Sequence, residues 1–330
     1  MRVLHSIFLV LLLATGALAA ELRQIAIIDL PGEPGFDGLA FAGGFLLISH
    51  TAANTLDVFD PQKRRLVAQV KDIPEPQGVA VDERVGRAYV SNGRANRISV
   101  ISTRDWKVVD TIATQAAPYA LALSTDGKLL FAANWRDKSI TVVEVGAGNR
   151  VRTERVDGTP YSLAYDPKGR VLYASMQDLQ EVATFDESLK LVRRLRLVAS
   201  QPTGLALDAE ARRLYVAVRH AVVAVQLDSG TEVGRVAAPP GADTLWLDKA
   251  SGTLYAASGG GFVTTVRADG SVFQTIDEIH TNVRGHTLAY DPQRQFVYLP
   301  GGREGKSKLL ILRRVSGAAP TQTTEISEAP

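Results

Sequence analysis

Residues 87–102, RAYVSNGRANRISVIS, contain two short apolar segments on either side of a polar turn. Both segments are rich in the aromatic and β-branched residues that favour strands, including Tyr89, Val90 and Ile98. The NGRAN between them consists mostly of residues that are common in tight turns. The stretch therefore predicts an antiparallel pair of strands, and the fold depends on whether this pair is repeated.

A short apolar signature recurs seven times along the chain. It reads GLAF, GVAV, ALAL, SLAY, GLAL, TLWL and TLAY, starting at Gly38, Gly78, Ala120, Ser162, Gly204, Thr244 and Thr287, at spacings of 40, 42, 42, 42, 40 and 43 residues. A second strand follows each signature, and most units add a third and a fourth. Four short strands in a unit of this length, with no helical period between them, are typical of a propeller blade. The sequence thus predicts an all-β, seven-bladed β-propeller with four antiparallel strands per blade.

The two ends of the repeat predict how the ring closes. The seventh unit ends at its third strand, KLLILRR, while LRQIAIIDL at residues 22–30 is an extra strand before the first signature. Glu21 to Arg314 contains 294 residues, or seven units of 42. We expect the N-terminal strand to complete blade seven, because closure removes exposed sheet edges.

The segment YVSNGRANRISVIS, residues 89–102, resembles the YVTN repeat, and LFAANWRDKSITVVE at 130–144 resembles it less closely. As a whole, the chain is similar to the exported, YncE-type propeller proteins of bacteria. This resemblance implies a seven-bladed ring in the periplasm or at the cell surface. It does not imply one activity, because propellers host binding, scaffolding, lactone hydrolysis and redox roles.

The N-terminal segment is typical of a secretory signal. Residues 1–20 contain Arg2, the apolar run IFLVLLLA and a small-residue close, so we predict cleavage after Ala19 or Ala20. An uncleaved anchor is the alternative. No later stretch approaches the length of a membrane span. We therefore expect a periplasmic or secreted protein with one propeller domain at 21–315 and a flexible tail at 316–330.

Charge and cysteine content restrict the partners and cofactors. The 37 Lys and Arg residues nearly balance 35 Asp and Glu residues, which gives no signal for a nucleic-acid or acidic-membrane partner. The chain has no cysteine, which excludes disulfides, thiolate metal sites and Cys-attached haem. We expect a monomer without a cofactor, whose partner is a small polar ligand or a periplasmic protein.

Function is predicted at one face of the ring. The loops joining strand four to the next strand one, and strand two to strand three, emerge together at the mouth of the central channel. All four histidines beyond residue 20, namely His50, His220, His280 and His286, map to this face, and histidines act as ligands and proton carriers near neutral pH. The alternative is that they are ordinary exposed loop residues. The predicted ligand-binding residues are Asp37, His50, Asn92, Arg94, Tyr119, Asn134, Trp135, Arg136, Tyr161, His220, Asp243 and His286.

Two features of this mouth permit more than one interpretation. Trp135 beside Arg136 is suited to stacking on and clamping a planar or anionic ligand, or it simply closes its loop. Asp37, Asp243 and His286 offer donors for a divalent cation. They lie on different blades without a local metal-binding spacing, so solvated pocket walls are the favoured interpretation and a metal site is the alternative.

Three functions are compatible with these features. The first is a non-catalytic binding or scaffold propeller that acts through the polar mouth. The second is a metal-assisted, lactonase-like hydrolase, and the third is an accessory propeller of a periplasmic, quinoprotein-type redox system. The absence of a clustered acid–base pair and of a G-x-S-x-G motif favours the first.

Overall fold

The computed structural model describes residues 20–146, 148–270 and 272–316. The predicted signal segment, apart from Ala20, and the predicted tail, apart from Ser316, lie outside the described residues. No helix long and apolar enough to cross a membrane occurs in the described part of the chain.

The described residues form seven four-stranded antiparallel sheets and contain no helix, as predicted. Blades one to three consist of β2 (Leu39–Ala42), β3 (Phe45–His50), β4 (Thr55–Asp60) and β5 (Arg65–Val70); β6 (Pro76–Asp82), β7 (Arg87–Asn92), β8 (Arg97–Ser102) and β9 (Lys107–Ala113); and β10 (Pro118–Leu123), β11 (Leu129–Asn134), β12 (Ser139–Glu144) and β13 (Arg150–Arg155). Blades four and five consist of β14 (Pro160–Asp166), β15 (Val171–Met176), β16 (Glu181–Asp186) and β17 (Leu191–Arg196); and β18 (Leu205–Asp208), β19 (Arg213–Val218), β20 (Ala221–Gln226) and β21 (Thr231–Ala237). Blades six and seven consist of β22 (Ala242–Asp248), β23 (Thr253–Ser258), β24 (Phe262–Ala268) and β25 (Phe273–His280); and β26 (Ala289–Asp291), β27 (Phe296–Arg303), β28 (Lys306–Ser316) and β1 (Ala20–Asp29).

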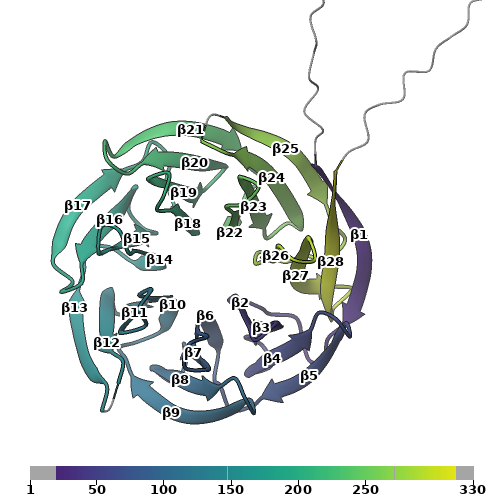
Figure 1. The fold of residues 1–330 in the computed structure, drawn as a ribbon, viewed down its shortest axis with the longest axis horizontal. Coiled ribbons are helices and arrows are strands. Elements are labelled where there is room, and N and C mark those ends of the chain that lie inside the picture. Colours follow the sequence, from purple (N-terminus) through teal and green to yellow (C-terminus); the bar gives the residue numbers. More distant parts are fainter. Residues whose placement is uncertain (1–19, 147, 271, 317–330) are drawn as a thin grey trace, which may run out of the picture.

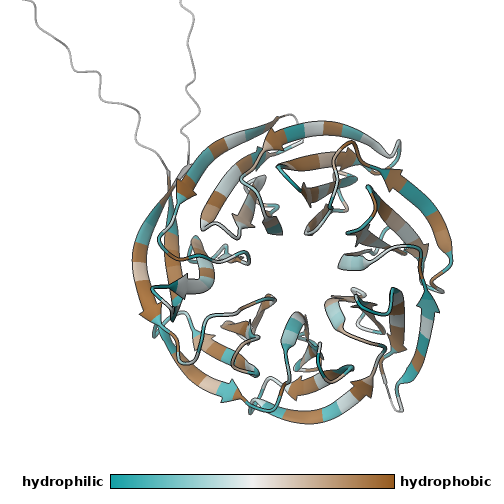
Figure 2. Ribbon diagram, turned by 180° about the vertical axis from the view of Figure 1, so that it is seen from behind, coloured by the Kyte–Doolittle hydropathy of each residue, from teal (hydrophilic) through white to brown (hydrophobic). Residues whose placement is uncertain are grey.

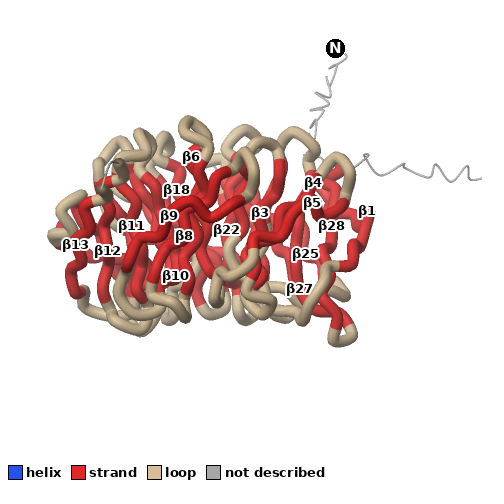
Figure 3. The backbone as a smooth tube through the Cα atoms, turned by 90° about the horizontal axis from the view of Figure 1, so that it is seen from below, coloured by secondary structure: helices blue, strands red, loops and turns tan. Residues whose placement is uncertain are grey.

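The blades surround a central channel, with the first strand of each repeat innermost (Figure 1). Seen from the side, the strands run between two layers of loops, so the ring has two loop faces (Figure 3). The second strands are buried along almost their whole length, whereas an outer strand such as β5 alternates between exposed and half-buried residues. Hydropathy alternates correspondingly along the outer strands (Figure 2).

Apolar side chains fill the spaces between neighbouring blades. The described residues form seven buried clusters, and each joins two adjacent blades; one, for example, contains Val58 of blade one with Val90 and Ile101 of blade two. Blade-to-blade packing of this kind buries both faces of the second and third strands. The core is therefore a ring of interfaces around the channel, and each blade depends on its neighbours for burial.

The N-terminal strand closes the ring, as predicted. β1 pairs with β28 in antiparallel register from Ala20↔Ser316 to Asp29↔Lys308, and the two strands lie side by side in Figure 1. Leu22 is buried, and its backbone N–H donates to Asp277 Oδ2 in blade six at 3.1 Å. The first residues of the ring are thus tied to both of the last two blades.

Candidate functional site

β-Bulges aim polar side chains into the channel. In β6, β10, β14 and β22 the register shifts by one residue near the start of the strand, so that two residues face one residue of the partner strand. In β10, for example, Tyr119 and Ala120 lie between the paired residues Pro118 and Leu121. A bulge bends a strand and re-aims its side chains. Here the bulged residues include Gln77 and three predicted mouth residues, Tyr119, Tyr161 and Asp243.

Five residues from five blades form a hydrogen-bonded chain across the channel, which we call the channel relay. The Tyr119 hydroxyl lies 3.1 Å from both carboxyl oxygens of Asp37 and 2.7 Å from the Tyr161 hydroxyl. Tyr161 donates to Asp243 Oδ2 at 3.0 Å, and His286 Nδ1 donates to the same oxygen at 2.8 Å. The sequence-predicted residues Asp37, Tyr119, Tyr161, Asp243 and His286 are therefore brought together.

Burial and charge shift the protonation of this relay. Burial raises the pKa of Asp37 to about 7, with a further contribution from Asp243 and an opposing one from His286. The hydrogen bond to Asp243 raises the pKa of His286 to about 9. Burial also raises the pKa of the Tyr119 and Tyr161 hydroxyls well above the usual value for tyrosine, so both phenols stay protonated. Such shifted groups are common at functional sites.

A cleft adjoins the relay on the same face. Its volume is about 240 Å³, and Tyr119 and Tyr161 line both this cleft and the channel, whose cavity is about 160 Å³. The other lining residues are Glu75, Gln77, Gly93, Ala117, Pro118, Trp135, Arg136 and Gln177. Trp135 is 40% exposed, and its indole N–H donates to Gln177 Oε1 at 2.9 Å, which holds the ring in place. The mouth therefore places the aromatic ring of Trp135 next to the polar side chains of the relay.

Three predicted mouth residues lie inside their blades instead. His50 is fully buried; its Nδ1 bonds Asp57 Oδ2 at 2.9 Å and its Nε2 bonds the Glu33 carbonyl at 2.8 Å. Asn92 and Asn134 are also fully buried, and their amide groups donate to hydroxyls of their own blades. The expectation that these side chains line the channel is wrong, because each one ends a second strand and is fully buried.

The remaining predicted residues lie at the rim. Arg94 is exposed, 3.8 Å from the Glu75 carboxylate, and Arg136 is exposed while lining the cleft. His220 lies exposed in the turn between β19 and β20. His280 ends β25, where its ring packs on Phe262 at a centroid distance of 4.5 Å. Of the four histidines, only His286 joins the relay.

The proposed metal ligands are bonded to each other or to tyrosines. Asp243 accepts from His286 and Tyr161, and Asp37 interacts with Tyr119. Among the described residues, no group of three or more His, Cys, Asp or Glu side chains is arranged to hold a metal ion. The geometry thus gives no support to a metal centre built from Asp37, Asp243 and His286.

The sequence contains a signal for the bulges, namely proline at the start of the bulged strands. Three of the four bulged innermost strands begin with proline, at Pro76 of β6, Pro118 of β10 and Pro160 of β14. Proline has no N–H for the sheet ladder and is confined to strand starts, edges and bulges. Glu75, which lies one residue before Pro76, lines the cleft and is not among the predicted mouth residues.

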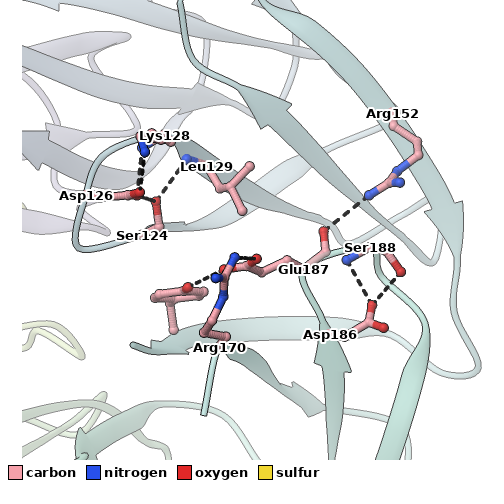
Figure 4. Close-up of polar contacts among 10 residues, drawn as sticks. Ser124, Asp126, Lys128, Leu129, Arg152, Arg170, Asp186, Glu187 and Ser188 are labelled. Carbon is pink, nitrogen blue, oxygen red and sulfur yellow. Dashed lines mark hydrogen bonds and ion pairs between the residues drawn. The ribbon is translucent and has the colours of Figure 1, made fainter. Parts of the chain in front are cut away.

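The opposite face holds a larger cleft that the sequence did not predict. It measures about 630 Å³ between blades three and four, and its charged residues form ion pairs within the protein. Arg170 bonds Glu187, and Asp126 bonds Ser124 and Lys128, as Figure 4 shows. The Glu187 carboxylate also accepts from Tyr165 at 2.6 Å. These charges are satisfied within the protein, so nothing in the cleft calls for a ligand.

Comparisons with known proteins agree with the propeller fold. Residues 87–190 match the family described as "Lactonase, 7-bladed beta-propeller". A chain of hydrazine synthase from Kuenenia stuttgartiensis superposes with a TM-score of 0.76 at 17% identity, covering 87% of this chain and 97% of that one. No curated protein matches the sequence significantly. The chain is thus a seven-bladed β-propeller whose residues 87–190 are similar to the lactonase family.

Proposed function

We propose that this protein is an exported propeller that binds a small polar ligand, or a side chain of a partner protein, at the mouth of its channel. The observation that carries the proposal is the channel relay beside the Trp135 cleft. Five polar side chains converge there from five blades, and four of them have strongly shifted pKa values. Polar groups converging next to an aromatic wall are the usual composition of a binding site.

The size of the cleft indicates the size of its ligand. At about 240 Å³ the cleft is smaller than the pockets that bind drug-sized molecules, which are about 300–1,000 Å³. It therefore suits a small molecule or a single side chain. Hydrogen bonds already fix the position of Trp135. Its backbone N–H donates to the Ala117 carbonyl at 2.9 Å, and its indole N–H donates to Gln177. Such pre-organisation lowers the entropic cost of binding.

The test is a thermal-shift and calorimetric screen of amines, amino acids, sugars and carboxylates against the protein from residue 21 onward. Trp135→Ala should weaken binding of any hit by about 1–3 kcal/mol, the scale of a buried aromatic anchor. Lys168→Ala is the matched control, because Lys168 is exposed on the opposite face and its ammonium pairs with Glu210 at the surface. Equal affinity in the wild type and both variants would place the ligand elsewhere and refute the proposal.

Lactone hydrolysis is the second candidate, and the family match over residues 87–190 favours it. That segment includes Tyr119, Trp135 and Tyr161, whereas Asp37, Asp243 and His286 lie outside it. A carboxylate that titrates near neutral pH is suited to general-base catalysis. Turnover of sugar or aliphatic lactones that disappears in Asp37→Asn would support this candidate over simple binding.

Export is a separate part of the proposal with its own test. We propose that the chain is cleaved after Ala19 or Ala20 and resides in the periplasm or outside the cell. Mass spectrometry of the protein recovered from its native host should give an N-terminus at Ala20 or Glu21. Recovery of the full chain from the cytoplasmic fraction would contradict export and would leave the binding proposal untouched.

A further inference from the structure

The channel relay has one hydrogen-bonding contact more than its two phenol hydrogens can supply. The Asp37–Tyr119, Tyr119–Tyr161 and Tyr161–Asp243 contacts each need one hydrogen. Each phenol supplies one hydrogen, and an ionised carboxylate supplies none. Three contacts therefore need a third proton, and it must come from a carboxyl group at one end of the relay.

Asp37 is the end that holds this proton. Asp243 accepts hydrogens from both Tyr161 and His286 on one oxygen, so this end of the relay receives hydrogens and does not supply the third one. Asp37 has no cationic partner in hydrogen-bond contact among the described residues. With Asp37 protonated, the hydrogens run in one direction, from Asp37 through Tyr119 and Tyr161 to Asp243. When Asp37 loses its proton, one of the three contacts has no hydrogen and is lost.

We infer that the mouth binds an organic cation, a primary ammonium or a guanidinium, in exchange for the proton that Asp37 shares with Tyr119. This inference rests on the proposed function and names its ligand class. A cation that approaches ionised Asp37 replaces the lost positive charge and brings N–H donors for the carboxylate oxygens. The exchange balances: one proton leaves the Asp37 carboxyl for solvent, and one cation takes its place.

Asp37 lines the channel cavity, and Tyr119 and Tyr161 line both that cavity and the adjoining Trp135 cleft, whose surroundings fit a cation. Tyr119 and Tyr161 lie with ring centroids 4.5 Å apart, and the exposed face of Trp135 lines the same cleft. Aromatic faces attract ammonium and guanidinium groups. Gln77 also lines the cleft; it is 9% exposed, and its Oε1 has no hydrogen-bond partner. Rotation of this amide would turn an unpaired acceptor toward a donor, and a buried unpaired acceptor is costly.

The charges that face Asp37 come from several elements. Asp243 on β22 and Glu75 before β6 raise its proton affinity, while His286 between β25 and β26 opposes them. With Asp37 ionised, the two aspartates and protonated His286 leave one net negative charge in the channel. Arg94 and Arg136 are exposed at the rim, where solvent and salt screen their charges. The inner site therefore attracts a cation once Asp37 is ionised.

The experiment compares ligands of one shape and different charge. Calorimetry with n-butylamine and butylguanidine, against neutral butanamide and anionic butyrate, should show binding of the cations only. An acetylated Gly-Lys-Gly amide then separates the two sources: tighter binding than n-butylamine indicates a protein side chain, and weaker binding indicates a free amine. Because the pKa of Asp37 is about 7, cation affinity should be about tenfold lower at pH 6 than at pH 8.

Proton release distinguishes exchange from simple attraction. Titrations in buffers of different ionisation enthalpy should show release of close to one proton per cation at pH 6 and close to none at pH 8. Asp37→Asn should bind the cation about tenfold more weakly at pH 8 and lose the pH dependence, while Asp126→Asn on the opposite face should match the wild type. If Asp37→Asn does not fold, the wild-type proton count still decides.

The outcomes separate this inference from the proposed function. Binding of butyrate or butanamide as tightly as the cations, or cation binding without proton release at pH 6, overturns the exchange. A sugar or carboxylate that binds at the Trp135 cleft while every cation fails refutes the cation alone and leaves the proposed function standing. Failure of every ligand class refutes both.

Discussion

Histidine has two different roles in this chain, and the difference lies in burial. His50 is enclosed in blade one with both ring nitrogens bonded and its ring on Phe36 at a centroid distance of 4.2 Å. His286 is 38% exposed, bonds Asp243 with Nδ1 and belongs to the relay. The sequence placed both on one loop face, but only the side-chain directions determine which one meets the channel.

At the residue scale, His50→Ala should destabilise the protein without affecting ligand binding. The variant leaves Asp57 Oδ2 and the Glu33 carbonyl without their partner and opens a void beside Phe36. We expect a loss of about 2–4 kcal/mol of unfolding free energy, measured by urea denaturation at pH 7. His220→Ala, at an exposed turn, should change it by less than about 0.5 kcal/mol. Similar losses in the two variants would contradict the structural role of His50.

Asp37 makes the stability of the protein depend on pH. Its pKa is about 7 in the folded protein against 3.8 as the ordinary value. The folded state therefore binds this proton more tightly than the unfolded state, and the stability that it contributes falls as pH rises from about 4 to 7. Asp37→Asn removes this loss. In calorimetric melting, the Tm of the variant minus the Tm of the wild type should increase between pH 4 and pH 7 and stay constant above pH 7. A constant gap from pH 4 upward would contradict the raised pKa.

At the element scale, the innermost strands are locked to one another at the level of the relay. The Gly38 N–H donates to the Gln77 carbonyl at 3.0 Å, and Ser91 Oγ donates to the Tyr119 carbonyl at 2.5 Å. On the other side of the ring, the Thr244 N–H donates to the His286 carbonyl at 3.2 Å. These contacts between blades set the position of each bulge, so a change in one innermost strand reaches the relay through the next.

Gly78→Ala tests this coupling between strands. A Cβ at Gly78 would lie 2.5 Å from the Tyr119 carbonyl oxygen and 2.9 Å from the Leu121 nitrogen, so β10 would have to move. We expect a loss of about 1–3 kcal/mol of stability and weaker ligand binding at the mouth. Gly146→Ala is the control, because a Cβ there meets nothing within 4 Å. Full ligand affinity in Gly78→Ala would show that the position of Tyr119 does not depend on β6.

The repeat made the elements predictable, and the site only in part. Period and strand patterning predicted all seven blades, since every unit had to bury the same positions. The same repeat indicates that His50, Asn92 and Asn134 are buried. Met176 and Val218 occupy the equivalent position, the last of a second strand, and both are apolar. The relay could not be predicted. Contacts such as Tyr119 to Asp37 depend on the bulges and on the width of the ring, which no local pattern records.

At the scale of the whole molecule, each blade packs against both of its neighbours. Each of the seven apolar clusters joins two blades, and the cluster that contains Leu22 and Val263 connects blade six to the closing blade. The relay likewise draws on blades one, three, four, six and seven. Stability and site geometry are therefore properties of the closed ring, and opening it at one interface should disturb both.

Deletion of residues 20–29 tests ring closure directly. β28 would lose its partner strand along the register from Ala20↔Ser316 to Asp29↔Lys308, and buried Leu22 would no longer cover blade six. We expect a loss of at least about 3 kcal/mol and a drop in Tm on the order of 6 °C or more. The unpaired edge of β28 should also promote association, visible by light scattering. A synthetic peptide of residues 20–29 should pair with β28, raise the Tm of the truncated protein and reverse its association, whereas a scrambled peptide should not. A truncated protein that stays monomeric and melts at the wild-type temperature would refute closure by β1.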